Sequence, residues 1–306
     1  MSRANAYRFT RYLAAKKSVD DRSLNRYVWD TLVEQIAEQD GPFRILEVGA
    51  GTGTMIERIM EWRLIDGEIN YTAIDAQSDN ISEARRYLHN WATHHGVEVR
   101  TTPSGLSLKN ERSTLNATLH TADAFAYVET QVKTPPFDLL IANAFIDLVN
   151  IPSALPKLFR ALKPGGLFYF SLTFDGITAF EPVIDATLDS QIEALYHADM
   201  EKRRWNNKPT GGSQAGRRLL RFVGNSDLEL LAAGASDWVV TPHRGDYRGD
   251  EAYFLHFIIH TIETALTGHP DLDAKQFKSW IIDRHNQVDN GILFYIAHQL
   301  DILGRI

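Results

Sequence analysis

The sequence predicts an α/β protein with a doubly wound, mostly parallel sheet of seven strands. Two observations lead to this fold class. Apolar runs of strand length alternate with amphipathic runs of helical length, and the first apolar run, residues 43–48, leads directly into a glycine-rich loop. Continuous apolar strands between such helices are typical of a parallel sheet that helices cover on both faces. The expected organisation is an N-terminal helical segment, residues 1–40, followed by one domain, residues 41–306.

The elements of the first half follow a regular order. Leu24, Val28, Leu32 and Ile36 recur at helical spacing, which predicts a helix over residues 22–38 that ends before Pro42. Behind the glycine loop, helices are expected at 53–64, 80–95 and 151–166, and strands at 68–75, 117–123, 137–143 and 167–174. Short β-prone runs around Pro103 and Gly105 suggest an inserted hairpin between residues 97 and 114.

The second half begins with a predicted insertion. Helical patterns fill residues 182 to 234 and are broken only at 206–216, so a helical lid insert is expected at about 180–234 after the fifth strand. Strands at 237–242 and 291–300 and helices at 251–266 and 275–286 complete the chain.

Composition narrows the classes of function. The 306 residues are 44% apolar, carry a formal net charge of -7 and include no cysteine. Nucleic acid is therefore an unlikely partner, and disulfides and thiolate metal sites are excluded. No apolar run is long enough to span a membrane. A cytoplasmic location is expected; the alternative, a transit peptide, rests on Arg3, Arg8, Arg11, Lys16 and Lys17 with no acid among them.

The glycine loop, "EVGAGTG", indicates a nucleotide-containing ligand. A dinucleotide-binding loop needs the spacing G-x-G-x-x-G, with a helix N-terminus that holds a pyrophosphate. Here Gly49, Gly51 and Gly53 alternate with other residues, which favours a ligand without a pyrophosphate. Glu47 at the strand end also suits a cationic ligand better than a pyrophosphate.

At this point the sequence resembles the class I S-adenosylmethionine-dependent methyltransferases. The resemblance rests on residues 47–53, on Asp75 at the end of the second strand, on Asp123 and Ala124 after the third, on "FDLLIANAF", and on "LFRALKPGGLFYFS". It implies a Rossmann-like methyltransferase fold over residues 43–174 and S-adenosylmethionine as the cofactor. The implied cofactor-binding residues are Glu47, Gly49, Ala50, Gly51, Gly53, Asp75, Asp123, Ala124 and Asn143.

The resemblance also implies individual roles. The glycine loop and Asn143 would lie along the methionine part, and Asp123 would bind the adenine amino group beside Ala124. Asp75 would accept hydrogen bonds from the ribose hydroxyls, for which a carboxylate has enough acceptor sites. An ordinary helix N-cap is the alternative role for Asp75.

Candidate catalytic residues are Asp147 and His243, since a hydroxyl or protonated amine acceptor needs a general base. Asp147 follows the fourth strand, where the alternative is a plain helix cap; His243 lies in a His-Arg-Gly-Asp loop, where the alternative is a bystander. Residues 143–146 keep an asparagine but lack the two prolines of enzymes that methylate DNA adenine or glutamine amides, which disfavours those substrates. His256 and His260 have the spacing of a metal pair but no third ligand nearby, so no metal is expected.

The basic segment, residues 202–221, holds seven Lys or Arg and no acid. It is either a solvated loop or a lid, hinged at Gly211 and Gly212, that closes over an anionic substrate. Candidate substrate-binding residues are Tyr7, Tyr12, Arg26, Phe145 and Arg217.

The function that these signals favour is transfer of a methyl group to oxygen, nitrogen or carbon of a small metabolite, anionic if the basic segment closes over it. The alternatives are a protein or RNA methyltransferase, a cofactor-binding domain without catalysis, and aminopropyl transfer; an NAD-dependent dehydrogenase is least favoured by the glycine spacing. Monomer and homodimer both stay open.

Overall fold

The computed structural model describes residues 7–37, 41–131 and 136–306. Its centre is a parallel sheet in which neighbouring strands run in the order β5, β2, β1, β6, β7. These strands are β1 (Phe43–Val48), β2 (Gly67–Asp75), β5 (Ser113–Thr121), β6 (Phe137–Asn143) and β7 (Leu162–Glu181). Because β2 and β6 flank β1 on opposite sides, the strand order reverses beside the carboxyl end of β1, which is where ligands bind in open α/β sheets.

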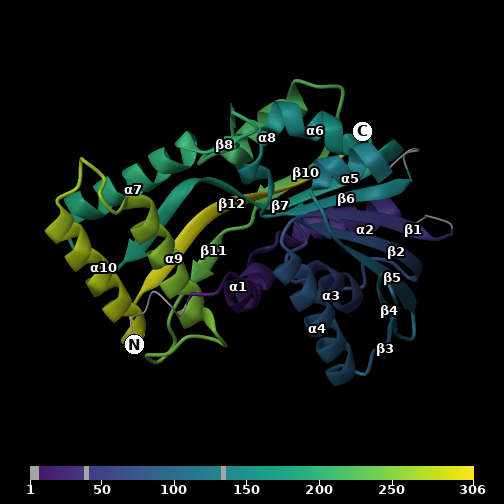
Figure 1. Cartoon of the computed structure of the whole chain (residues 1–306), viewed down its shortest axis with the longest axis horizontal. Helices are drawn as coiled ribbons and strands as arrows, with labels where there is room; N and C mark the ends of the chain where they lie inside the picture. Colours follow the sequence, from purple (N-terminus) through teal and green to yellow (C-terminus); the bar gives the residue numbers. More distant parts are fainter. Residues whose placement is uncertain (1–6, 38–40, 132–135) are drawn as a thin grey trace.

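Antiparallel strands extend both edges of this sheet (Figure 1). Within the described residues the sheet has ten strands. The expected hairpin is present as β3 (Glu98–Thr101) and β4 (Gly105–Lys109), beside β5. At the other edge β12 (Phe294–Arg305) pairs with β7, and β10 (Glu229–Ala235) and β11 (Trp238–Val240) pair with β12. The doubly wound, mostly parallel fold is confirmed, and its sheet has more strands than the seven predicted.

Helices cover both faces of the sheet. Successive β1 side chains point to opposite faces, so Ile45 belongs to one core cluster and Leu46 to the other. On the Ile45 side lie α1 (Phe9–Ser23), α2 (Arg26–Ile36), α3 (Thr54–Glu61) and α4 (Ser78–His94). On the Leu46 side lie α5 (Ala124–Gln131), α6 (Ile151–Phe159) and α8 (Ala215–Gly224).

Two predicted boundaries differ from the structure. The helix expected over residues 22–38 is divided, because α1 ends at Ser23 and the Asn25 side chain caps α2 by accepting from Val28 N at 3.1 Å. Residues 229–235, expected to be helical, form β10. Their Leu and Ala residues favour a helix locally, but pairing with β12 decides the outcome.

The far halves of β7 and β12 project beyond the parallel sheet and carry a second helical layer (Figure 1). It consists of α7 (Ala186–Lys202), α9 (Glu251–Leu266) and α10 (Ala274–Asp289), and α1 packs against α9. After α7 the chain forms a two-stranded hairpin, β8 (Arg204–Trp205) and β9 (Lys208–Pro209), before α8. Within the described ranges, no helix is long and apolar enough to cross a membrane.

Candidate active site

The glycine loop turns sharply from β1 into α3. Gly49, Gly51 and Gly53 have φ angles of 69°, 54° and 79°, a left-handed backbone that residues with a side chain rarely adopt. A Cβ atom at Gly49 would stand 2.7 Å from the Phe145 ring, and one at Gly53 would stand 3.1 Å from Leu88. The alternating glycines therefore serve both the turn and its close packing.

Asp75 ties this loop to the end of β2. Its Oδ2 accepts a hydrogen bond from Gly51 N at 2.9 Å, and its Oδ1 accepts from Gln77 N at 2.8 Å and from Asn80 Nδ2 at 3.1 Å. A carboxylate has about four acceptor sites, so about one remains for a ligand hydroxyl. The carboxylate is thus held by the chain and still able to bind.

Glu47 is a buried acid beneath the glycine loop. Tyr71 donates a hydrogen bond from its hydroxyl to Oε2 at 2.8 Å, and only 1% of the residue is exposed. Burial raises the pKa of Glu47 to about 8; the Tyr71 hydrogen bond and Arg58 oppose this shift, and the charge of Asp75 adds to it. A cation bound nearby would favour ionisation of Glu47.

Two adjoining cavities open at the carboxyl ends of the parallel strands. The larger, of 330 Å³, is lined by Glu47, Ala50, Gly51, Asp75 and Asn143, among others. The smaller, of 160 Å³, is lined by Asp123, Ala124 and Phe125 among others, and Gly49, Ala76, Phe145 and Leu148 line both. Every predicted cofactor residue except Gly53 thus lines at least one of the two cavities, and Gly53 is the N-cap residue of α3.

Asp123 combines the two roles that an acid at this position can have. Its Oδ1 accepts from Phe125 N at 3.0 Å and from Ala126 N at 2.9 Å, so it caps the start of α5. The same residue lines the smaller cavity beside Ala124, where one face of the carboxylate can meet a ligand.

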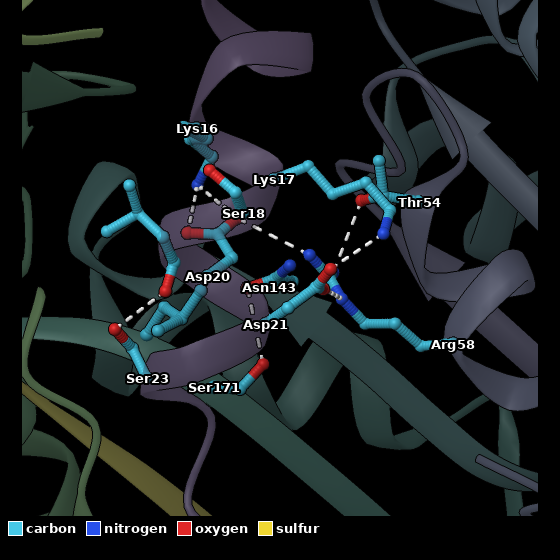
Figure 2. A network of polar contacts seen from close by, with 12 residues as sticks. Lys16, Lys17, Ser18, Asp20, Asp21, Ser23, Thr54, Arg58, Asn143 and Ser171 are labelled. Atoms are coloured by element: carbon cyan, nitrogen blue, oxygen red, sulfur yellow. Dashed lines mark hydrogen bonds and ion pairs between the residues drawn. The ribbon is translucent and has the colours of Figure 1, made fainter. Parts of the chain in front are cut away.

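The N-terminal segment does form a wall of the larger cavity, but through other residues than predicted. Phe9, Leu13, Lys16 and Asp20 of α1 line it. Lys16 and Asp20 face each other at 3.0 Å, with Asn143 and Ser171 nearby (Figure 2). The spacing of these four residues along one helix face is the signal that would have found them, once the helix was known to start near residue 9.

Asp147 lies just beyond β6, in the short 3₁₀ helix η2 (Ile146–Leu148). Its Oδ1 is buried and has no hydrogen-bond partner within the described residues. Burial raises the pKa of Asp147, opposed by its own backbone and by the charges of Arg203 and Lys16. Buried carboxylate oxygens without a partner are uncommon in folded proteins, so this oxygen is a candidate for contact with a bound molecule.

Tyr12 lies near this acid without lining either cavity. Its ring stacks on Phe257 at a centroid distance of 4.2 Å. Burial raises the pKa of Tyr12 well above its ordinary value, and the charges of Asp20 and Asp147 add to the shift.

Four other predicted residues are engaged elsewhere. Tyr7 stacks on His260 at 4.2 Å, Arg26 lies over the Trp62 ring at 4.3 Å, and Arg217 pairs with Asp175 at 2.9 Å. His243 is in an exposed turn, where its backbone pairs with Asp246. None of the four lines either cavity. No local pattern in the sequence indicated these contacts. Because the first three side chains are engaged there and His243 lies in an exposed turn, we propose no role for these four residues in the site.

The two histidines of α9 also have different partners. His256 Nδ1 lies 2.8 Å from His285 Nδ1 and its Nε2 lies 3.1 Å from Asp289, whereas His260 lies against Tyr7.

Most charges of the basic segment are engaged within the chain. Arg203, Arg217 and Arg218 pair with Asp199, Asp175 and Glu201, Lys208 donates to Ser153, and Arg204 donates to backbone carbonyls. The expected hinge is closely packed, because a Cβ atom at Gly211 would stand 2.9 Å from Ile146 O. Trp205, which the sequence analysis did not single out, lines the smaller cavity.

Comparison with known proteins found one matching family model and several proteins of similar structure. Residues 46–168 match the family model of a methyltransferase domain. A protein described as a type II methyltransferase from Anaeromyxobacter dehalogenans has a similar structure, with a TM-score of 0.51 and 17% identity over 93% of this chain and 97% of that one. An S-adenosylmethionine-dependent methyltransferase from Geobacter sulfurreducens, solved with S-adenosyl-L-homocysteine, has a TM-score of 0.46 and 13% identity over 96% and 97% of the two chains. No curated protein matches the chain by sequence.

The chain has the Rossmann-like methyltransferase fold, and the part of it over residues 46–168 matches a methyltransferase domain.

Proposed function

We propose that the chain transfers a methyl group from S-adenosylmethionine to a small, anionic metabolite, and that Asp147 is the general base. The single observation that carries this proposal is the buried Asp147 Oδ1, which has no partner among the described residues. Asp147 itself lines neither cavity, but Phe145 and Leu148, two residues before it and one after it in the chain, line both. The cofactor supplies an activated methyl group, so the protein has mainly to align the acceptor and exclude water.

The proposed cofactor site uses both cavities. Gly49, Ala50 and Gly51 lie along the methionine part with Asn143 and Glu47, and Asp75 binds the ribose. Asp123 and Ala124 bind the adenine in the smaller cavity. The supporting fact is that these residues converge on two connected cavities at the point where the strand order reverses.

The acceptor is proposed to lie between Phe145, Asp147 and α1. A raised pKa suits Asp147 to take a proton from a hydroxyl or ammonium group as methyl transfer proceeds. Lys16 of α1 lines the larger cavity and pairs there with Asp20 at 3.0 Å, and this cation is the support for an acceptor that carries a negative charge. Tyr12 lines neither cavity and is proposed only to pack behind this part of the site, where its ring stacks on Phe257.

A nucleic acid or protein acceptor finds less support. Most charged side chains of the basic segment, which would have to bind a phosphate backbone, pair within the chain. Helix α1 also closes the larger cavity from one side. A small molecule fits an enclosed site better.

Turnover with a panel of hydroxy acids, amino acids and phenols, followed as release of S-adenosylhomocysteine, tests the proposal. Asp147→Asn should lower kcat at least about 100-fold on the acceptors that the wild type methylates, because general-base catalysis contributes about 10²- to 10⁴-fold. Its affinity for S-adenosylhomocysteine should stay within about threefold, since the change removes no cofactor contact.

Asp138→Asn is the matched control, because Asp138 lies at the amino end of β6, the strand that precedes the Asp147 loop, pairs there with Lys163 and lines neither cavity. It should turn over like the wild type. Equal kcat for Asp147→Asn and wild type would exclude Asp147 as the base, and transfer to RNA but to no small molecule would exclude the acceptor class.

A further inference from the structure

The hairpin β8–β9 supplies one wall of the smaller cavity. Trp205 lines this cavity, and its ring centroid lies 4.6 Å from that of Phe125 on α5. Phe125 lies within the part of the chain that matches the methyltransferase family model, residues 46–168, whereas Trp205 lies outside it. This wall is therefore an addition carried by the segment between β7 and α8.

Side chains hold the hairpin against the start of α6. Asn150 donates from Nδ2 to Pro209 O at 2.7 Å, and Lys208 Nζ donates to Ser153 Oγ at 2.7 Å. The indole of Trp205 also lies under a cation, Lys157, at 5.9 Å. The hairpin is consequently attached to the same loop region that follows β6.

The chain then continues from the hairpin directly onto the Asp147 loop. Gly211 N donates to Val149 O at 2.8 Å, and Gly212 N donates to Asp147 O at 3.2 Å. A side chain at Gly211 would collide with Ile146 O and with Asp147 Cα. One short segment, residues 205–212, thus contacts the smaller cavity at one end and the backbone of Asp147 at the other.

We propose that Trp205 packs against the adenine of the cofactor and that residues 205–212 connect this contact to the Asp147 loop, so that cofactor binding orders the loop before the acceptor binds. The inference rests on the proposed placement of adenine in the smaller cavity and is independent of the role of Asp147 as a base. Aromatic side chains stack on nucleobases through the ring face, and a flat indole beside Phe125 and Ala124 provides such a surface.

Binding measurements with the full chain test the contact. We expect Trp205→Ala to lower the affinity for S-adenosylhomocysteine at least about tenfold, because removal of an aromatic side chain that stacks on a base usually has an effect of this size. The affinity for methylthioadenosine, which has the adenine but no amino acid part, should fall by a similar factor in Trp205→Ala. Trp205→Phe should stay within about threefold of the wild type for both ligands, because it keeps an aromatic face.

Trp62→Phe is the matched control. Trp62 is another half-buried tryptophan, but it lies against Trp29 and Arg26 and lines neither cavity. Binding of S-adenosylhomocysteine should change the tryptophan emission of the wild type and of Trp62→Phe, but not of Trp205→Phe. Unchanged affinity of Trp205→Ala, or an emission change that persists in Trp205→Phe, would overturn the contact.

Amide hydrogen exchange tests the connection. Saturating S-adenosylhomocysteine should slow exchange over residues 146–149 and 210–212 in the wild type. Lys208 is exposed and lines neither cavity, and Lys208→Met removes its hydrogen bond to Ser153. The variant should keep its affinity for S-adenosylhomocysteine within about threefold of the wild type, but it should lose a large part of the protection from exchange. Equal protection in Lys208→Met, and in Trp205→Ala at saturation, would overturn the connection while leaving both the cofactor assignment and the proposed base intact.

Discussion

Glu47→Gln should abolish a proton release that accompanies binding of S-adenosylmethionine to the wild type. Burial holds the pKa of Glu47 at about 8, so the acid is mostly neutral at pH 7 in the free protein. A bound cation stabilises the ionised carboxylate, and the proton must then leave. The glutamine variant keeps a side-chain oxygen for the hydroxyl of Tyr71 but has no proton to release.

The magnitude follows from the pKa. With a pKa of about 8, about 0.9 of the carboxyls carry a proton at pH 7, so binding should release roughly 0.9 proton per site. The ionised fraction rises from about 0.03 at pH 6.5 to about 0.8 at pH 8.5, so the apparent affinity should rise roughly 25-fold over this range. The sign is fixed by the raised pKa: affinity increases with pH and levels off above the pKa of the free protein.

Isothermal titration in buffers of different ionisation enthalpy measures the released proton directly. Glu57→Gln is the matched control, because Glu57 is also buried and also accepts from a tyrosine hydroxyl, that of Tyr87, but does not line the larger cavity. Proton release below about 0.2 in the wild type, or equal release in the wild type and Glu47→Gln, would refute the reasoning.

Two further predictions concern the ribose site and the stability of the fold. Asp75→Asn should lower the affinity for S-adenosylhomocysteine at least about tenfold, because an amide NH₂ replaces one of the two carboxylate oxygens that accept from Gly51 N and from a ribose hydroxyl. Equilibrium dialysis measures this affinity, and an unchanged value would contradict the assignment. Arg284→Met should lower the free energy of unfolding by about 3–5 kcal/mol, because it leaves the buried Asp189 without the cation that it pairs with at 2.7 Å. In urea unfolding the exposed Arg100→Met, which pairs with Glu98, should cost at most about 1 kcal/mol, and equal losses in both variants would contradict the argument.

Local patterns predicted the elements that combine a strong hydrophobic period with a clear turn. The strand before Gly49, the acid at the end of β2 and the alternation of strands and helices up to β7 follow from residues close together in the sequence. Weaker local signals were misleading where pairing across the sheet was stronger than helix propensity, as in β10 against β12.

Some residues of the candidate site could be predicted from local patterns, and others could not. Glu47, Gly49, Asp75 and Asp123 sit at strand ends, and the parallel sheet necessarily brings such ends to one edge, so their convergence was predictable from the sequence. Arg217 could not be judged in this way, because its partner Asp175 is 42 residues away and only the packing of α8 on β7 joins them.

The sequence by itself predicted the glycine turn and the acids at successive strand ends, because these are local features whose geometry the backbone imposes, and S-adenosylmethionine followed from the family that they resemble. The tertiary structure alone decided which residues of distant segments enclose the site: Lys16 and Asp20 from α1, and Trp205 from the β8–β9 hairpin. The physical reason is that these walls depend on how α1 and the hairpin dock on the sheet, which long-range packing sets and no local pattern encodes.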